Sequence, residues 1–550
     1  MAIALGILGY FSWPRVEMKQ TFSKATNSRF RRSNFFWQPP GRRTTLSKID
    51  FSATQYVLTF EEGEQIRIDR LLIHEIEFDS LRWLADFHFH DQSSQQVNFI
   101  GKLNLSGSDV ILNPYLTCPL AAMAKFETPV KGMFKIIIHG KAPGGVTIVK
   151  SYDHFSEFHE LPILGLYESL ENKVEFVFMN KNGEARCSKV AIISTPEIQD
   201  KPAFEIQIIK EHSTTEYQGL YFISNLRLAF DQAGEIRWYY NGEGRSFFGK
   251  LRNGNFVIST EDNLYFHEVT MTGQLVKKYY VPNQLHHEIV ELPWGNFLVA
   301  AHSPPGPPNE DVVVEIDRNS GAVVKTWDFN TILDPSRQTL PSTQAGDWLH
   351  VNAMYYDESD NSFVICGRSQ SAVIKIDYAT STIKWILSNH NHWTQEFQPY
   401  LLHPVDALGN AVAENGIDFW PYGPHATQKL PNGNLLLYDN GDYRGFYDNP
   451  DVPQESYTRA VEYKIDAHQK TVQLVWQFDN SKTVFTKFTG YVQNLPGTNT
   501  RLMAYMWVTP QTPRILEIDA NDKVIFDAMM NPGKVSYYRT MKFDLYEGID

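Results

Sequence analysis

Three histidines occupy the same place in three copies of one sequence repeat. His287, His350 and His425 each precede a large apolar or aromatic residue by five positions, and a turn and an apolar strand follow. Equivalent positions of a closed repeat fold lie at one height around one axis. Imidazole near neutral pH is a nucleophile, a general base or a metal ligand. The spacing therefore predicts that three imidazoles meet in one binding or catalytic cavity.

The repeat does not require histidine at this position. Ser246 and Gly490 take the place in two other copies. A lone histidine at the start of a strand is usually a hydrogen-bonded polar residue, but that interpretation is weaker for three at one offset.

Arg368 adds a cation to this group. It lies one predicted strand after His350, among small and apolar residues. The planar guanidinium donates two parallel hydrogen bonds to an oxyanion, so an arginine near imidazoles predicts an anion site. The alternative is an arginine exposed on a surface loop.

Two His-x-His pairs predict a different chemistry. His88 with His90, and His390 with His392, would each share one face of a strand, where they could bind Zn or Cu. No third ligand of matching spacing stands nearby, so we predict no metal site. The chain also lacks the phosphate-loop, G-x-S-x-G and H-E-x-x-H motifs, and we expect no cofactor.

The elements that must position these residues are strands. Short β-branched and aromatic runs alternate with turn residues, and helical periodicity is nearly absent, so the sequence predicts an all-β chain. Six hairpins with acidic or polar turns are typical of the outer strands of propeller blades; they cover residues 230–240, 269–280, 315–329, 375–387, 464–478 and 517–530. We therefore predict a six-bladed β-propeller over residues 201–550.

The strand that enters each intervening Leu-Pro-x-Gly-Asn type hairpin is expected to be the innermost of its blade. The histidines would then lie at one mouth of the central channel. The longest insertion, residues 390–424, separates the fourth and fifth outer hairpins and is typical of a functional loop.

The N-terminal part has a different organisation. Residues 49–200 contain strands without an obvious repeat, and a β-sandwich is the simplest prediction. Residues 1–48 carry nine Lys and Arg against one Glu. We expect a basic lead-in that is disordered or resembles a signal or membrane anchor. Its apolar stretch at residues 2–13 is too short to span a bilayer, and no basic residue precedes it.

Composition narrows the classes of function. The net charge of −13 argues against nucleic acid as a partner. The three cysteines lack metal-ligand spacing, and their scarcity suits an exported enzyme.

Several motifs extend this interpretation to a family. They are DWLHVNAMYYD at 347–357, GRSQSAVIKID at 367–377, IKWIL at 383–387, GPHATQKLPNGNLLLYDNG at 423–441 and TRAVEYKID at 458–466, with LNPYLTCPLAAM at 112–123 and LPILGLYESLENKV at 161–174. From about residue 105 to its end the chain resembles the bacterial arylsulfate sulfotransferases. The resemblance implies a six-bladed propeller after a β-domain, a periplasmic location and often a homodimer.

The resemblance also implies a reaction. A sulfuryl group passes from a phenolic sulfate donor to a phenolic acceptor by a ping-pong mechanism through a sulfohistidine, without a nucleotide sulfate donor. His425 is similar to the family's nucleophile, and His350, Arg368 and His287 are similar to its other sulfate-site residues. Asn352 is similar to an active-site asparagine. The sequence does not divide acid and base roles between His287 and His350.

The segment before His425 departs from the family. The loop at 404–419 lacks the family's cysteine pair, and Trp420 and Tyr422 stand where an aromatic-Thr-Gln segment is usual. We predict that Asn352, Trp420 and Tyr422 contact substrate.

Two other functions fit the same residues. A propeller metalloenzyme would hold Fe(II) or Zn with the histidines; the charge of Arg368 and the lack of a carboxylate in the repeat position argue against it. A non-catalytic propeller would bind an anionic ligand or a partner protein without turnover.

Overall fold

The computed structural model describes residues 109–549 apart from short gaps, together with the backbone of eight earlier strands. The gaps are residues 200, 203, 215–216, 305, 308, 342, 415, 446–455, 508–511 and 531–536. The chain divides into two compact units, with the boundary between Glu197 and Ile198 and with Tyr115–Pro119 belonging to the second unit. Within the described part of the chain, no helix has both the length and the apolar character needed to cross a membrane.

The first strands form two four-stranded sheets, in the orders β1-β3-β4-β5 and β2-β8-β7-β6. Their bounds are β1 Arg15–Val16, β2 Met18–Lys19, β3 Thr44–Phe51, β4 Gln55–Phe60, β5 Gln65–Asp69, β6 Ile73–Asp79, β7 Leu84–Phe89 and β8 Ser94–Asn98. Apart from these strand backbones, the predicted lead-in at residues 1–48 lies outside the described residues, as do the side chains of His88 and His90.

A third sheet completes the first unit, in the order β11-β10-β12-β13 with β9 paired to β10. Its strands are β9 Val110–Leu112, β10 Ala121–Ile138, β11 Ile148–Leu164, β12 Glu171–Met179 and β13 Ala185–Ser194. Phe134 on β10 pairs with Phe178 on β12, and both rings are buried. Burial of one face and exposure of much of the other follow from the two-residue period of a strand.

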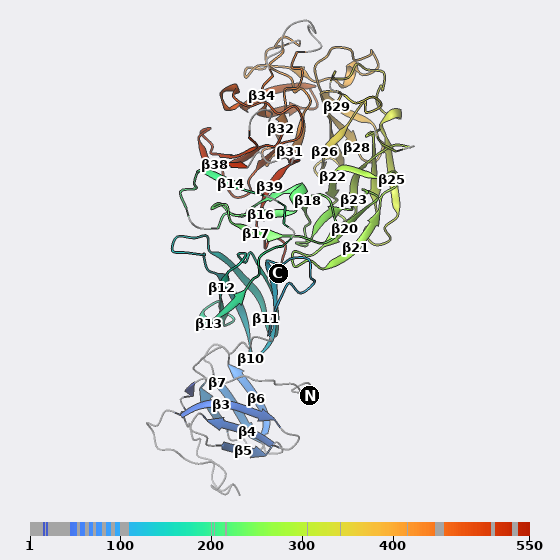
Figure 1. Cartoon of the computed structure of the whole chain (residues 1–550). Coiled ribbons are helices and arrows are strands. Elements are labelled where there is room, and N and C mark those ends of the chain that lie inside the picture. The colour runs from blue at the N-terminus through green and yellow to red at the C-terminus, as the bar shows by residue number, and fades with distance from the viewer. Residues whose placement is uncertain are drawn as a thin grey trace. The chain divides into compact units, whose positions relative to one another are not determined.

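The described residues of the second unit form six sheets, which are antiparallel apart from one short parallel strand, β30 (Figure 1). Their orders along the chain are β17-β16-β15-β39, β18-β19-β20-β21, β22-β23-β24-β25, β26-β27-β28-β29, β30-β34-β33-β32-β31 and β14-β38-β37-β36-β35. Each of the six predicted outer hairpins lies in a sheet of its own. The prediction of an all-β propeller chain is confirmed, because this order is what radial repetition of one hairpin pair produces.

The strands of the second unit begin with β14 Ile206–Lys210, β15 Leu220–Ile223, β16 Leu228–Phe230, β17 Ile236–Tyr239, β18 Phe247–Lys250, β19 Phe256–Ser259, β20 Tyr265–Val269, β21 Leu275–Tyr280, β22 Leu285–Glu291, β23 Phe297–Ala301, β24 Val312–Ile316, β25 Val323–Asp328 and β26 Val351–Asp357. They continue with β27 Ser362–Gly367, β28 Ala372–Asp377, β29 Ile383–Leu387, β30 His403–Pro404, β31 His425–Lys429, β32 Leu435–Asp439, β33 Arg459–Asp466, β34 Thr471–Phe478, β35 Tyr491–Asn494, β36 Arg501–Tyr505, β37 Arg514–Ile518, β38 Val524–Met530 and β39 Thr540–Phe543. Short 3₁₀ turns lie at Ser224–Leu226, Phe329–Thr331, Gln398–Tyr400 and Asn480–Lys482.

The two ends of the unit close the ring of sheets. The C-terminal strand β39 pairs with β15 in the first sheet, and the N-terminal strand β14 pairs with β38 in the last. The strands β18, β22, β26, β31, β35 and β39 contact one another in this order. They are the inner strands, as the sequence predicts for those that enter the Leu-Pro-x-Gly-Asn type hairpins.

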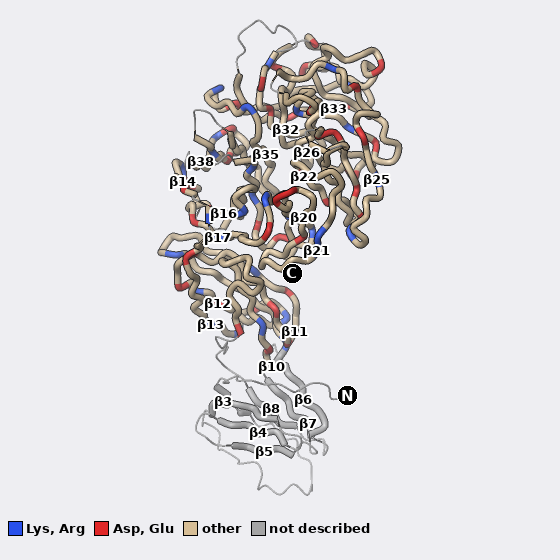
Figure 2. Tube along the Cα trace, turned by 45° about the vertical axis from the view of Figure 1, so that its right-hand side comes forward, with Lys and Arg blue, Asp and Glu red and all other residues tan. Residues whose placement is uncertain are grey.

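The repeated Ile-Asp pair explains why the outer hairpins turn where they do. Ile316 is fully buried between the sheets, and Asp317 follows at the turn. Its Oδ1 accepts the backbone N–H of Ser320 at 2.7 Å. Asp377 and Asp466 make equivalent bonds at their own turns. A short acidic side chain that accepts nearby N–H groups stabilises a tight turn. Figure 2 shows acidic and basic residues intermixed along this unit.

Candidate functional site

The inner strands carry local irregularities where the three histidines lie. Pairing in β22 shifts between Leu285 and Ile289, in β26 between Val351 and Ala353, and in β31 between His425 and Thr427. The backbone has positive φ at His287 (41°), His350 (59°) and Ala426 (42°). A bulge redirects a side chain, and a positive φ is rare for residues with a Cβ. The backbone thus stores strain where the predicted site residues lie.

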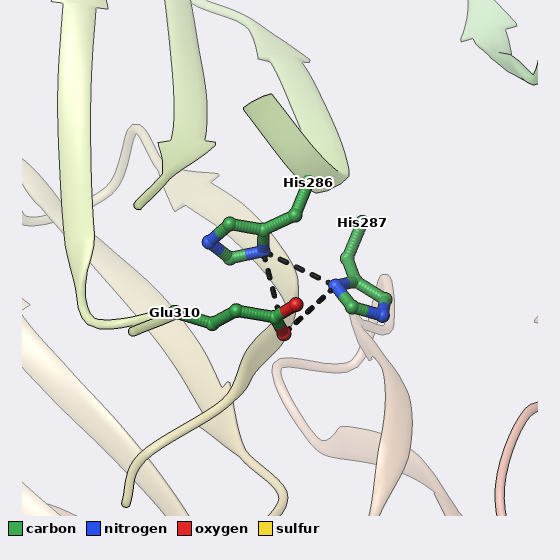
Figure 3. A group of neighbouring side chains, drawn as sticks. All are labelled: His286, His287 and Glu310. Carbon is green, nitrogen blue, oxygen red and sulfur yellow. Dashed lines mark hydrogen bonds and ion pairs between the residues drawn. The ribbon is translucent and has the colours of Figure 1, made fainter. Parts of the chain in front are cut away.

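His287 and His350 come together beside a carboxylate. Their ring centroids lie 4.6 Å apart. The carboxylate belongs to Glu310, two residues before β24 begins. Its Oε2 lies 3.2 Å from Nδ1 of His287 and 2.8 Å from Nδ1 of His350. Oδ2 of Asp347 lies 2.5 Å from the same His350 nitrogen. Figure 3 shows His286 and His287, neighbours on β22, both directed toward Glu310.

The carboxylates set the charge of these histidines. Burial on its own would lower the pKa of His350, but Glu310 and Asp347 outweigh it and raise the pKa to about 9. Burial of Glu310 is likewise outweighed by His287 and His350, and its pKa lies well below the usual range. Burial lowers the pKa of His286 to about 3. At neutral pH the site therefore holds an imidazolium at His350, an ionised Glu310 and a neutral His286.

His425 is held as a neutral imidazole. Asn440 donates its Nδ2 hydrogens to the carbonyls of Thr486 and Thr489, both at 2.9 Å, so its Oδ1 faces His425 as an acceptor. Nδ1 of His425 lies 2.7 Å from that oxygen and must carry the proton. Nε2 then keeps its lone pair, which accepts the Thr489 N–H at 3.2 Å. Burial, followed by the charges of Arg368 and His350, holds the pKa of His425 well below its ordinary value.

Arg368 is a buried cation in this group. Its backbone N–H donates to the His350 carbonyl at 3.1 Å, and its Nη2 donates to Oδ2 of Asp442 at 3.0 Å. The side chain is almost fully buried. Burial lowers its pKa and Asp442 opposes that effect. The surface-loop alternative for Arg368 is wrong, because the residue follows β27 directly and is enclosed.

Asn352 links β26 to the residue before His425. Its Nδ2 donates to the Pro424 carbonyl at 2.9 Å. Its buried Oδ1 has no hydrogen-bond partner among the described residues, which leaves an acceptor for a ligand hydroxyl.

Trp420 and Tyr422 lie in the hydrophobic core with fully buried side chains, packed with Leu435, Leu437 and Tyr463. Their contact with substrate stays a prediction. Other aromatic rings lie beside the charged groups. The ring of Tyr538 is 5.5 Å from that of His287, and the ring of Phe488 is 5.9 Å from Cζ of Arg368.

A second buried ion pair supports His287. Nη1 of Arg539 donates to both oxygens of Glu288, at 3.1 and 2.9 Å, and its Nη2 donates to the His287 carbonyl. Arg539 directly precedes β39, so the closing strand of the ring fixes the strained backbone at His287.

Several residues of the site were not predicted from the sequence: Glu310, Asp347, Asn440, Thr489, Phe488, Tyr538 and Arg539. Asp347 and Asn440 do lie inside motifs quoted for the family resemblance. The others come from loops and strands with no repeat signature. The sequence shows no carboxylate in the repeat position, yet the fold brings two beside the histidines. His286, His287 and Glu310, and also Glu310, Asp347 and His350, place ligand atoms within 4.8 Å of one another.

Comparison with known proteins identifies relatives of both units. Residues 205–539 match the family model described as Arylsulfotransferase (ASST), and residues 109–196 match the Arylsulfotransferase Ig-like domain. The arylsulfate sulfotransferase AssT of Escherichia coli O6:H1 is 26% identical over 560 residues, covering 78% of this chain and 92% of that protein. AssT of Lelliottia amnigena is also 26% identical, over 68% of this chain and 80% of that protein.

A solved structure of a Bacteroides caccae protein of unknown function covers 59% of this chain and 98% of that chain, with 12% identity and a TM-score of 0.36. That likeness is too distant to bear on the site.

Proposed function

The chain belongs to the arylsulfotransferase family and is a sulfotransferase, and on this premise we propose that it transfers a sulfuryl group from a phenolic sulfate to a phenol through a sulfohistidine at His425. One observation carries the proposal. A buried, neutral imidazole, whose unprotonated Nε2 accepts only the Thr489 N–H at 3.2 Å among the described residues, lies within electrostatic reach of the cations Arg368 and His350. Such a nitrogen attacks without first losing a proton.

In the first half-reaction, Nε2 of His425 forms a bond to sulfur as the bond between sulfur and the aryl oxygen breaks. A phenolate leaves, and the ring becomes a sulfonated imidazolium. Its Nδ1–H still donates a hydrogen bond to Oδ1 of Asn440. In the second half, a phenol oxygen attacks sulfur, its proton passes to a base, and His425 returns to the neutral form. The two halves constitute a ping-pong cycle, with no nucleotide donor and no cofactor.

Charge stabilisation is the main task of the other residues. By analogy with phosphoryl transfer, the transition state is loose and its charge lies on the terminal oxygens, so positioning and fixed cations dominate. Arg368 and protonated His350 hold the sulfuryl oxygens. Oδ1 of Asn352 accepts the hydroxyl of the phenol, and the rings of Tyr538 and Phe488 flank the aryl group.

The charge of His350 supports one division of the roles that the sequence leaves open. With a pKa raised to about 9, His350 is protonated at neutral pH and acts as a donor. The base that accepts the phenol proton is then His287, through Nε2, while its Nδ1 faces Glu310 at 3.2 Å.

The proposal is tested with a chromogenic aryl sulfate, with and without a phenol. Release of the chromophore beyond one turnover is expected only when the phenol is present, together with formation of the new sulfate ester. Binding of the sulfate ester without turnover would instead favour the non-catalytic propeller. A periplasmic location and a homodimer also belong to the proposal, and fractionation of cells and the sedimentation of the purified chain test them.

The protonation of His350 predicts a pH dependence. Since its pKa is raised from 6.5 to about 9, its charge contributes to stability fully below about pH 6.5, and this contribution is lost as the pH rises through about 9. Chromophore release in the first turnover is expected to fall over the same upper range. Glu310→Gln removes the carboxylate that raises the pKa of His350 most. In this variant the loss of first-turnover chromophore release should therefore begin at lower pH.

The first turnover is measured without acceptor, because the phenol has its own titration. Glu358→Gln, at an exposed glutamate paired with Arg252, is the matched control and should keep the wild-type profile. An unchanged pH profile in Glu310→Gln would contradict the assigned role of His350.

A metal centre at Glu310 is the second candidate function, because the structure places the carboxylates beside the histidines. A stoichiometric metal that is lost in Glu310→Gln, together with loss of activity on chelation, would favour it. The hydrogen-bonded proton on Nδ1 of His350 favours the sulfuryl-transfer site, since a metal there would have to displace it.

A further inference from the structure

Two histidines and a glutamate form a separate cluster in the insertion between β29 and β31. Oε2 of Glu414 lies 3.2 Å from Nδ1 of His390, and its Oε1 lies 2.8 Å from Nδ1 of His403. The two imidazole rings have centroids 5.3 Å apart and are nearly perpendicular. All three candidate ligand atoms lie within 4.8 Å of one another. The cluster shares no residue with the site around Glu310.

The hydrogen bond of His390 fixes the direction of its lone pair. Its Nε2 lies 2.9 Å from the Leu402 carbonyl, which accepts only, so Nε2 carries a proton. In the neutral ring Nδ1 then has a lone pair, and that lone pair points at a carboxylate oxygen. The Nδ1 lone pair of His390 and Oε2 of Glu414 are both acceptors, 3.2 Å apart. This contact requires either a cation between the two atoms or a second proton on the imidazole ring. Metal-bound histidines show this same arrangement, with the second nitrogen donating to a carbonyl.

The surroundings fit a cation. Among the described residues no Lys or Arg forms an ion pair with Glu414, and its partners at that distance are the two imidazoles. The side chains of His403 and Glu414 are 54% and 53% exposed, whereas His390 is 12% exposed. One ligand is thus anchored in the fold and two stand on the side open to solvent, from which an ion can enter.

We propose that His390, His403 and Glu414 bind one Zn²⁺, with water as the fourth ligand. Zinc prefers four nitrogen and oxygen ligands at about 2.0–2.2 Å, which places neighbouring ligand atoms roughly 3.4 Å apart. The separations of 2.8 and 3.2 Å run from the imidazole nitrogens to the two different oxygens of Glu414. With one ligand atom from each residue, the three atoms lie within 4.8 Å of one another, so shifts of roughly an ångström bring them to that geometry. Imidazole with one carboxylate suits Zn²⁺ better than Mg²⁺ or Ca²⁺, which prefer all-oxygen sites.

The proposed ion would hold the insertion against Trp420, in the segment that leads to His425. Nε1 of Trp420 donates to the Glu414 carbonyl at 2.7 Å, and the Trp420 ring lies 5.4 Å from that of His390. Trp420 is fully buried, five residues before His425. A Zn²⁺ ion bound by His390, His403 and Glu414 would therefore fix the insertion to the hydrophobic core at Trp420. The proposed role of the ion is structural.

The test is a Zn²⁺ titration of the full chain after removal of metals with a chelator. The wild type is expected to bind one equivalent that His403→Ala and Glu414→Gln both lose. His392→Ala is the matched control, because this exposed histidine lies outside the cluster, and it should retain the equivalent. Glu310→Gln should also retain it, which separates this site from the one around Glu310.

Two further readouts distinguish a metal from a proton. Excess Zn²⁺ should raise the Tm of the wild type by about 2–4 °C and leave that of His403→Ala unchanged. Co²⁺ in place of Zn²⁺ should give the intense visible absorption of four-coordinate cobalt. Equal zinc stoichiometry in the wild type and both cluster variants, or no binding at equimolar zinc, would overturn the proposal and leave a protonated His390 as the explanation.

Discussion

Replacing His425 by alanine is expected to reduce sulfuryl transfer from an aryl sulfate to a phenol by on the order of 10⁴-fold or more. The methyl group of alanine cannot form the covalent intermediate, and the remaining cations bind the donor without providing a nucleophile. The variant should still bind the sulfate ester, because Arg368 and His350 are unchanged. Donor with ³⁵S in the sulfate should label the wild-type chain at His425 in the absence of acceptor, and should not label the variant.

His468→Ala serves as the matched control for this prediction. His468 is an exposed residue in the turn of an outer hairpin, where its backbone N–H donates to Asp466. This variant should keep wild-type transfer and labelling. Near-wild-type transfer by His425→Ala, with correct folding shown by circular dichroism, would refute the sulfohistidine mechanism.

Arg368→Lys is expected to lower kcat/KM by about 10²–10³-fold, the usual effect of losing one electrostatic donor at a developing charge. Lysine keeps the positive charge beside Asp442, but its ammonium cannot replace the planar fork that donates two parallel hydrogen bonds to sulfuryl oxygens. We choose lysine because alanine would remove one partner of a buried ion pair, which costs about 3–5 kcal/mol of folding free energy.

Steady-state kinetics separates two possible roles of Arg368. A fall in kcat indicates that the guanidinium acts on the transition state, whereas a rise in KM with unchanged kcat would limit it to binding of the donor and contradict our assignment. Arg318→Lys is the control for the exchange. Arg318 pairs with Glu268 on β20 and Glu291 at the end of β22, and its variant should keep wild-type kinetics.

The fold was predictable because its signals are local. The two-residue alternation of the strands and the Ile-Asp turn of four of the six outer hairpins lie within about fifteen residues, and each predicted outer hairpin lies in a sheet of its own. The closure of the ring of sheets could not be predicted from local sequence signals. β14 and β39 join sheets at the opposite end of the chain, a pairing that depends on the complete ring.

In the insertion between β29 and β31, spacing along the sequence does not predict which side chains meet. Alternation along a strand pairs His390 with His392, but this segment is not a strand, and its backbone brings His390 to His403 and Glu414 instead. Trp420 and Tyr422 are close to His425 in sequence, and folding buries both side chains in the hydrophobic core; their contact with substrate stays a prediction.

The positions of His287, His350 and His425 follow from the sequence, because residues at one register of a repeat must face one axis. Arg368 is predicted from its place one strand after His350 among small and apolar residues. The chemical states of these residues do not follow from the sequence. Glu310 and Asp347 charge His350, and Asn440 selects the proton position on His425. Asp347 is three residues from His350, but Glu310 and Asn440 lie on other segments of the chain. A pKa or a tautomer depends on distances of a few ångströms to charges and acceptors, and folding alone brings those groups together.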